Sequence, residues 1–314
     1  MQQTAIRTLV LALALTAAGV GAHAQTATAP RGHLVIVGGG PRPASVMERF
    51  VALAGGPKRA RIVVIPNASG DVETAEGRKA AAEAGDDFVA EMRKAGVEAT
   101  SVLLTRAEAE DPASAKLLDG ATGVFFTGGQ QDRLTRALKG TPVEAKLHAL
   151  YDGGAVISGT SAGAAVMSEV MLTGDERHPG GVDRPDTTLS YVTIARENVV
   201  TAPGFGFVRN AIVDQHFVRR KRLNRLLSLV LEHPALLGVG IDESTALEVA
   251  PDGRWTVLGN SIAVVYDARG ARITAPGAVL GATPLRLSIL PAGSVFDPRT
   301  GEATLPSAPA RAGR

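Results

Sequence analysis

The pattern that most constrains the fold is the alternation of short apolar runs, rich in β-branched residues, with helix-compatible segments. The runs are Leu34–Val37, Ile62–Ile65, Val97–Leu104, Gly123–Thr127 and Ala155–Ser158. The helix-compatible segments are Thr74–Ala95, Asp111–Leu118 and Ala162–Met171. This alternation predicts an α/β fold, a three-layer α/β/α sandwich with a mostly parallel sheet, whose ligands gather at the carboxyl ends of the strands.

After Gly238 the apolar runs become shorter and indicate an antiparallel addition. They are Gly238–Ile241, Trp255–Leu258 and Ile262–Val265. No internal repeat or long linker interrupts the chain, so residues 25–300 are expected to form a single domain. Residues 301–314, rich in Pro, Ala, Gly and Arg, are predicted to be a flexible tail.

Residues 1–24 are expected to be a signal peptide. Arg7 precedes an apolar stretch from Leu9 to Val20, and Ala22 and Ala24 are small residues of the kind a signal peptidase accepts. The alternative is a membrane anchor, but the stretch has about a dozen residues and a span needs ~20. Cleavage after Ala24 predicts a periplasmic or secreted protein without a stable membrane anchor.

The composition excludes several kinds of site. The 314 residues include no Cys, and 33 Lys+Arg against 31 Asp+Glu give a formal net charge of +2. Without Cys there is no thiol nucleophile or Cys-ligated metal, so a covalent catalyst must be an oxygen or a nitrogen. The small net charge and the 4% of aromatic residues give no indication of nucleic-acid binding. No histidine spacing typical of a metal site is present, and no cofactor is expected.

The glycines after the first run, Gly38–Gly40, do not match a nucleotide-binding motif. They lack the G-x-G-x-x-G spacing and the Lys-Ser/Thr pair of a phosphate-binding loop. A tight turn beside a pocket is the preferred interpretation.

The strongest chemical signal is Gly159-Thr160-Ser161-Ala162-Gly163. It lies between a predicted buried strand and a helix-capable run, which is the setting of a nucleophile elbow. The helix N-terminus would favour a developing oxyanion. The alternatives are a chance G-x-S-x-G in a glycine-rich chain and a serine that only caps the helix.

His216 is the preferred base among the six histidines. It follows the apolar run Ile212–Val213 at a predicted strand end, where a parallel sheet presents catalytic groups. The alternative is a structural histidine. Cations crowd the helix that follows: Arg219, Arg220, Lys221, Arg222 and Arg225. Cations at a helix N-terminus oppose the macrodipole, which favours an anionic substrate over a solvated basic face.

Four segments together resemble the cyanophycinases of serine peptidase family S51. They are Thr127–Gln131, Gly159–Met167, Asp214–Phe217 with the arginines that follow, and Gly240–Ala246. The resemblance runs from about Leu34 to about Leu290. It implies a class I glutamine-amidotransferase-like fold related to peptidase E. It also implies hydrolysis of the aspartate backbone of cyanophycin, multi-L-arginyl-poly-L-aspartate, to β-Asp-Arg dipeptides.

The resemblance also implies roles for individual residues. Ser161 is the nucleophile and His216 the base, and the substrate pocket is lined by Gln131, Asp214, Gln215, Arg220, Arg222 and Arg225. The family places a Glu after the nucleophile helix as third member, which assigns Glu176, with Asp175 as the alternative, in a loop longer than the family's. Backbone N–H groups of Gly129 and Ala162 are oxyanion-hole candidates, because a strand-end glycine pair lies opposite an elbow.

The sequence therefore predicts an exported serine peptidase that is acylated at Ser161 and acts on cyanophycin or on Asp/Arg-containing peptides. The alternatives are an α-aspartyl dipeptidase of the peptidase E type and a non-catalytic periplasmic binding module. A monomer and a homodimer both remain open.

Overall fold

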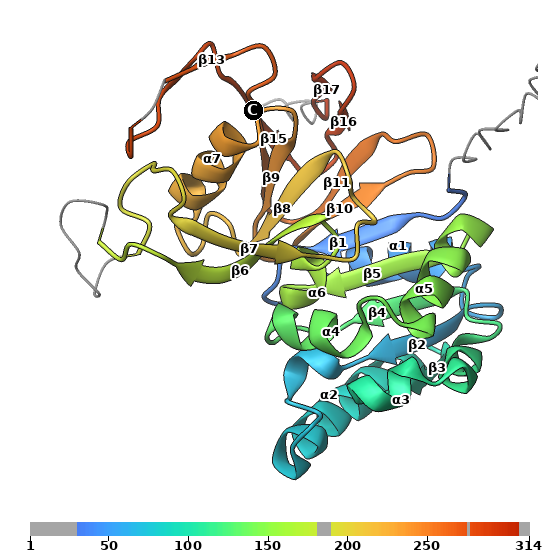
Figure 1. The fold of residues 1–314 in the computed structure, drawn as a ribbon. Helices are drawn as coiled ribbons and strands as arrows, with labels where there is room; N and C mark the ends of the chain where they lie inside the picture. The colour runs from blue at the N-terminus through green and yellow to red at the C-terminus, as the bar shows by residue number, and fades with distance from the viewer. Residues whose placement is uncertain (1–29, 181–189, 275–276, 308–314) are drawn as a thin grey trace, which may run out of the picture.

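A nine-stranded sheet forms the centre of the computed structural model, which describes residues 30–180, 190–274 and 277–307 (Figure 1). Five neighbouring strands are parallel and the other four are antiparallel. In spatial order they are β17 (Glu302–Thr304), β16 (Val295–Asp297), β11 (Trp255–Gly259), β10 (Thr245–Val249), β1 (Leu34–Val37), β5 (Val156–Thr160), β4 (Gly123–Phe126), β2 (Arg61–Ile65) and β3 (Glu98–Ser101). The parallel strands β1 to β5 correspond to the five apolar runs, which confirms the predicted α/β fold.

Helices cover both faces of the parallel half. On one face lie α1 (Ala44–Leu53) and α2 (Ala75–Lys94), and on the other lie α3 (Arg106–Glu110), α4 (Gln131–Leu138), α5 (Pro142–Gly153) and α6 (Ala162–Ala165). Val35 and Val37 of β1 pack toward α1 and α2, and Leu34 and Ile36 pack toward the opposite helices. A strand buried on both faces needs a continuous apolar sequence, and β1 has one.

A second sheet stacks on the antiparallel half. Its order is β15 (Arg286–Pro291), β12 (Ile262–Asp267), β9 (Leu237–Ile241) and β8 (Ala211–Gln215). Val213 and Val239 on one face share a core with Leu247 and Trp255 of the main sheet. The helix α7 (Leu223–Glu232) covers the other face (Figure 1). The addition predicted after Gly238 is therefore divided between two sheets, and its pairing is antiparallel except that β9 is parallel to β8.

The expected helix over Ala162–Met171 stops after one turn. Phe205 N–H donates to Val166 O (2.7 Å) and Val208 N–H donates to Met167 O (2.8 Å). These carbonyls bond to another segment, so the chain leaves the helix and forms the hairpin of β6 (Val170–Glu176) and β7 (Val199–Pro203).

Smaller elements complete the fold. They are the 3-10 helices η1 (Asn67–Ser69) and η2 (Pro112–Leu118) and the two-residue strands β13 (Arg272–Ile273) and β14 (Ala282–Thr283). The segment predicted as a helix over Asp111–Leu118 is thus a 3-10 helix that follows α3.

Part of the predicted tail forms a strand. Glu302–Thr304 pair with β16 as an edge strand, which corrects the expected boundary. Residues 308–314 and the proposed signal peptide lie outside the described residues. Among the residues that are described, no helix has the length and apolar character needed to cross a bilayer.

Candidate active site

Ser161 lies in a strained turn between β5 and α6. Its φ of 55° and ψ of −108° are values that L-residues rarely adopt. The turn also requires small neighbours, because a Cβ at Gly159 would lie 2.5 Å from the Gly163 carbonyl oxygen, and a Cβ at Gly163 would lie 2.4 Å from the Phe126 oxygen. The turn therefore has the geometry of the predicted nucleophile elbow.

A chain of two hydrogen bonds joins Ser161, His216 and Glu243. Ser161 Oγ lies 2.9 Å from His216 Nε2, and His216 Nδ1 lies 2.6 Å from Glu243 Oε1. His216 follows β8, and Glu243 lies in the turn between β9 and β10. A carboxylate only accepts, so Nδ1 carries the hydrogen and Nε2 accepts from the Ser161 hydroxyl. This is the connectivity of a Ser-His-acid triad.

The glycine turn after β1 connects the three segments that carry these side chains. Three consecutive carbonyls of the turn each accept one backbone N–H. The pairs are Ser161 N to Val37 O (3.0 Å), His216 N to Gly38 O (2.6 Å) and Ser244 N to Gly39 O (3.0 Å). Gly38–Gly40 form a turn, as predicted, and the turn also sets the spacing of the triad.

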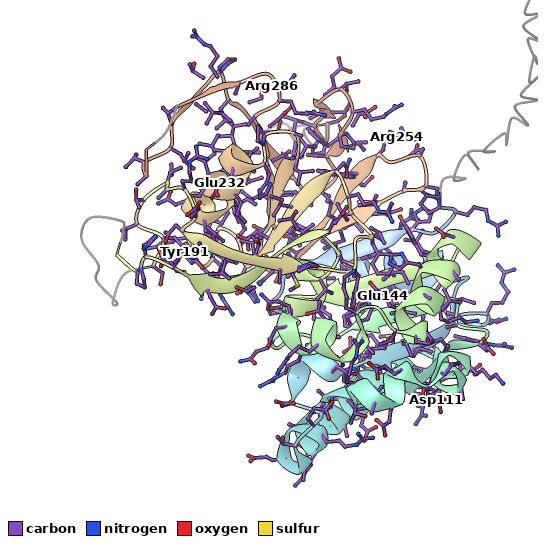
Figure 2. The ribbon with its side chains drawn as sticks, in the orientation of Figure 1. Asp111, Glu144, Tyr191, Glu232, Arg254 and Arg286 are labelled. Carbon is purple, nitrogen blue, oxygen red and sulfur yellow. The ribbon has the colours of Figure 1, made fainter. Side chains whose placement is uncertain are left out.

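Glu176 does not hold the place predicted for it. Its Oε1 accepts from Tyr191 N (2.7 Å) and from Asn198 Nδ2 (2.9 Å), so it ties the β6–β7 connection together (Tyr191 is labelled in Figure 2). Asp175 instead accepts from Thr173 Oγ1 (3.0 Å).

Glu243 is the carboxylate that the sequence reasoning missed. The sequence reasoning placed the carboxylate in the loop after the nucleophile helix, whereas the partner of His216 lies in the turn that follows β9. A signal was present, because Glu243 lies within Gly240–Ala246, one of the segments that carry the family resemblance, and stands two residues after a predicted strand.

Asp214 and Arg225 form a buried ion pair. Arg225 Nε donates to Asp214 Oδ2 (2.8 Å), a second contact joins Nη2 and Oδ1, and the two side chains are 1% and 3% exposed. The expectation that both residues line the substrate pocket is wrong, because their side chains pair with each other below the protein surface. The Asp214 carboxylate is therefore not free to hold a substrate guanidinium.

The remaining predicted pocket residues differ in accessibility. Arg222 Nη1 donates to the backbone oxygen (2.7 Å) and to Oε1 (2.8 Å) of Gln215, and burial together with the nearby Arg225 lowers the pKa of Arg222 to about 10. Gln131 is buried and its Nε2 donates to Leu172 O (2.8 Å) and to Thr173 O (2.7 Å). Arg220 is exposed.

The pKa of His216 is lowered from its ordinary value. Burial of the imidazole is the main cause, and the positive charges of Arg220 and Arg222 add to it. The hydrogen bond to Glu243 acts in the opposite direction without cancelling the effect. His216 is therefore neutral at neutral pH, as a general base must be.

The two oxyanion-hole candidates are Gly129, in the loop after β4, and Ala162, within the elbow. Gly129 has a φ of +138°, and a Cβ there would lie 2.0 Å from Ala68 O, so only glycine fits. A Cβ at Gly128 would lie 3.4 Å from Ser161 Cβ, which places this loop against the nucleophile. Ala162 opens α6, so its N–H has no partner within the helix. Both groups remain predictions for this role.

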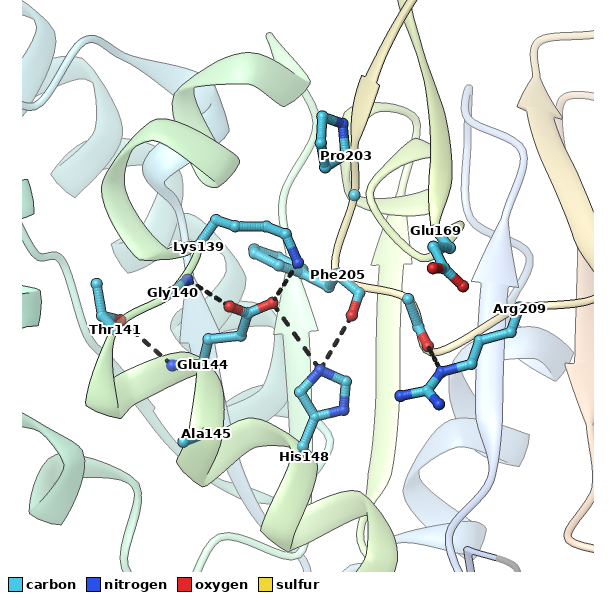
Figure 3. Close-up of a pocket in the computed structure, with 12 residues that line it drawn as sticks. Lys139, Gly140, Thr141, Glu144, Ala145, His148, Glu169, Pro203, Phe205 and Arg209 are labelled. Atoms are coloured by element: carbon cyan, nitrogen blue, oxygen red, sulfur yellow. Dashed lines mark hydrogen bonds and ion pairs between the residues drawn. The ribbon is translucent and has the colours of Figure 1, made fainter.

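A polar hollow of about 610 Å³ lies elsewhere, beside α5 and the segment that leads into β8 (Figure 3). Its lining groups pair with one another: Lys139 Nζ donates to Glu144 Oε1 (3.0 Å), and His148 Nε2 lies 3.0 Å from the backbone oxygen of Phe205. No triad residue lines it. In the described ranges, no group of three or more His, Asp or Glu side chains is placed to hold a metal ion.

An α/β/α sheet with a serine elbow and a Ser-His-Glu chain of hydrogen bonds defines a serine-type hydrolase. Residues 34–256 match the family model described as Peptidase family S51. The chain belongs to peptidase family S51, and it is a serine-type peptidase.

Curated relatives and a solved structure agree with this family. The chain is 35% identical over 281 residues to the cyanophycinase of Synechococcus elongatus, covering 86% of this chain and 80% of that one. It is 33% identical over 263 residues to the cyanophycinase of Geminocystis herdmanii, covering 81% and 88%. The crystal structure of a peptidase from an acI-B1 Actinobacterium aligns with a TM-score of 0.59 at 23% identity, over 86% of this chain and 98% of that one, and supports the fold.

Proposed function

We propose that the protein hydrolyses the aspartate backbone of cyanophycin to β-Asp-Arg dipeptides through an acyl-enzyme on Ser161. The observation that carries the proposal is the Ser161–His216–Glu243 chain of hydrogen bonds. The chain that carries this arrangement is similar, over most of its length, to proteins that are named cyanophycinase.

The geometry supports a two-step reaction. Ser161 Oγ attacks a backbone carbonyl carbon while its proton passes to His216 Nε2, and Glu243 holds the Nδ1–H of the resulting imidazolium. The oxyanion faces the N–H groups of Gly129 and Ala162. When the C–N bond breaks, Nε2 returns the proton to the leaving amine. Water, deprotonated by His216, then hydrolyses the ester and restores the Ser161 hydroxyl.

The charges beside the triad suit an anionic group. Arg220 is exposed and close enough to lower the pKa of His216, and Arg222 is half-buried next to it. Guanidinium groups bind carboxylates through paired hydrogen bonds. We expect the carboxylates of the polymer to lie on this side of Ser161.

Mass spectrometry of the products formed from cyanophycin tests the proposal. Release of β-Asp-Arg supports it. Faster cleavage of Asp-X dipeptides than of the polymer would favour the α-aspartyl dipeptidase. Binding of the polymer without cleavage, and without labelling by a serine-directed fluorophosphonate, would favour a binding module.

Export is a further part of the proposal. It rests on the basic start, the short apolar stretch and the small residues before Gln25. N-terminal sequencing of the protein purified from the cell envelope or the medium should begin at Gln25. An intact Met1 on a protein retained in the cytoplasm would contradict export.

A further inference from the structure

A second hollow lies directly beside the nucleophile, between α2 and the ends of β4 and β5. Its volume is about 300 Å³, and the residues that matter here are Arg42, Asp87, Phe88, Phe125, Gly128 and Thr160. We call it the Arg42 pocket. Thr160 precedes Ser161 in the chain, and Gly128 lies against the Ser161 side chain. A group bound there would therefore be adjacent to the bond that Ser161 attacks.

The floor of the Arg42 pocket is aromatic and carries a guanidinium. The rings of Phe88 and Phe125 stack at 4.2 Å, and the Arg42 guanidinium lies 5.7 and 5.8 Å from their centroids. Arg42 Nη2 donates to Glu91 (2.5 Å). Its Nε is buried and finds no acceptor among the described residues. The Arg42 guanidinium therefore keeps a donor that the described side chains leave unused.

Asp87 supplies a free negative charge at the same pocket. It is exposed on α2, and within the part of the chain that the structure describes it makes no hydrogen bond or ion pair. The Arg42 pocket thus offers the free carboxylate of Asp87 and a guanidinium that is paired with Glu91 through Nη2 and keeps an unsatisfied Nε donor, on an apolar floor. A residue that bears both a guanidinium and a carboxylate is complementary to this arrangement.

We propose that the Arg42 pocket is a subsite for the arginyl residue of the polymer unit next to the one acylated on Ser161. Asp87 accepts the guanidinium of that residue, and Arg42 faces its carboxylate. This inference rests on the proposed function. In this subsite the substrate guanidinium pairs with a carboxylate, a role that the buried Asp214 cannot take.

The test uses the full-length protein with Ser161→Ala, which binds substrate without turning it over. Calorimetry measures the affinity for β-Asp-Arg and for a fragment of three β-Asp-Arg units. Adding Asp87→Asn should lower the ratio of the two affinities about three- to tenfold, the effect of one partly exposed charge-assisted contact. Asp86→Asn, a neighbouring exposed carboxylate that does not line the pocket, is the matched control and should leave the ratio unchanged.

A second fragment identifies the group that Asp87 meets. With citrulline, whose side chain is uncharged, in place of each arginine, Asp87→Asn and Asp86→Asn should bind equally. Equal affinities for the arginine fragment in both variants would overturn the subsite even if the wild-type enzyme degrades the polymer. Failure of the wild-type enzyme to degrade cyanophycin would instead overturn the proposed function.

Discussion

The imidazole of His216 rests directly on Gly39. A Cβ at residue 39 would lie 2.3 Å from His216 Cε1 and 2.4 Å from Nε2, so no other residue fits beneath the ring. Gly39 also has a φ of +109° and accepts the Ser244 N–H through its carbonyl. The turn after β1 therefore sets where the base lies relative to Ser161.

Gly39→Ala should displace the imidazole and lower kcat by about 100-fold, because misplacing a reacting group by roughly 1 Å costs that much. The matched control is Gly96→Ala. Gly96 also has a positive φ, of +73°, but open space for a Cβ, so the variant places an alanine at positive φ without a steric contact. Steady-state kinetics on cyanophycin compare the two. An equal loss of kcat in both variants would show that backbone strain, and not contact with the imidazole, causes the loss at Gly39.

Glu243→Gln should lower kcat by about 10⁴-fold, since an amide can no longer fix the Nδ1–H tautomer or stabilise the imidazolium. Glu176→Gln should keep kcat within a few fold, because the hydrogen bonds of Glu176 to the described residues go to the β6–β7 connection and not to His216. Thermal unfolding of both variants provides the control for folding. A larger kcat loss in Glu176→Gln than in Glu243→Gln contradicts the assignment of Glu243.

The acid limb of the pH profile of kcat/KM should have its midpoint below pH 6.5. Activity needs neutral His216, whose pKa is lowered mainly by burial and further by Arg220 and Arg222. Arg220→Gln removes one positive charge, so the pKa of His216 rises and the limb moves to higher pH. Arg209→Gln, an exposed cation elsewhere, should leave the limb in place. A shift to lower pH in Arg220→Gln would contradict the electrostatic account.

Asp214→Asn should destabilise the protein by about 3–5 kcal/mol, because it leaves the buried Arg225 guanidinium without its counter-charge. Asp132→Asn, at an exposed i,i+4 pair with Arg136, should cost at most about 0.5 kcal/mol. Urea unfolding measures both. If Asp214→Asn proves as stable as Asp132→Asn, the buried pair does not stabilise the fold.

Local sequence was sufficient for the parts of the molecule that local rules determine. The apolar runs predicted the parallel strands, and the glycines around Ser161 predicted the elbow, because close packing there excludes any Cβ. His216 could be chosen by elimination and by its place at a strand end.

Other features depend on how distant segments stack. Glu243 reaches His216 only because the second sheet lies over the antiparallel half of the first, and no spacing along the chain encodes that stacking. The family resemblance implied a place in the substrate pocket for Asp214 and Arg225. Their burial follows from α7 packing against β8, which the sequence pattern does not reveal.

The most direct test of the central claim is the rate at which wild-type protein and Ser161→Ala release β-Asp-Arg from cyanophycin, measured by mass spectrometry. The account predicts that the wild-type protein releases the dipeptide and that Ser161→Ala, folded and able to bind the polymer, is slower by at least about 10³-fold. Release at a comparable rate by Ser161→Ala would contradict it.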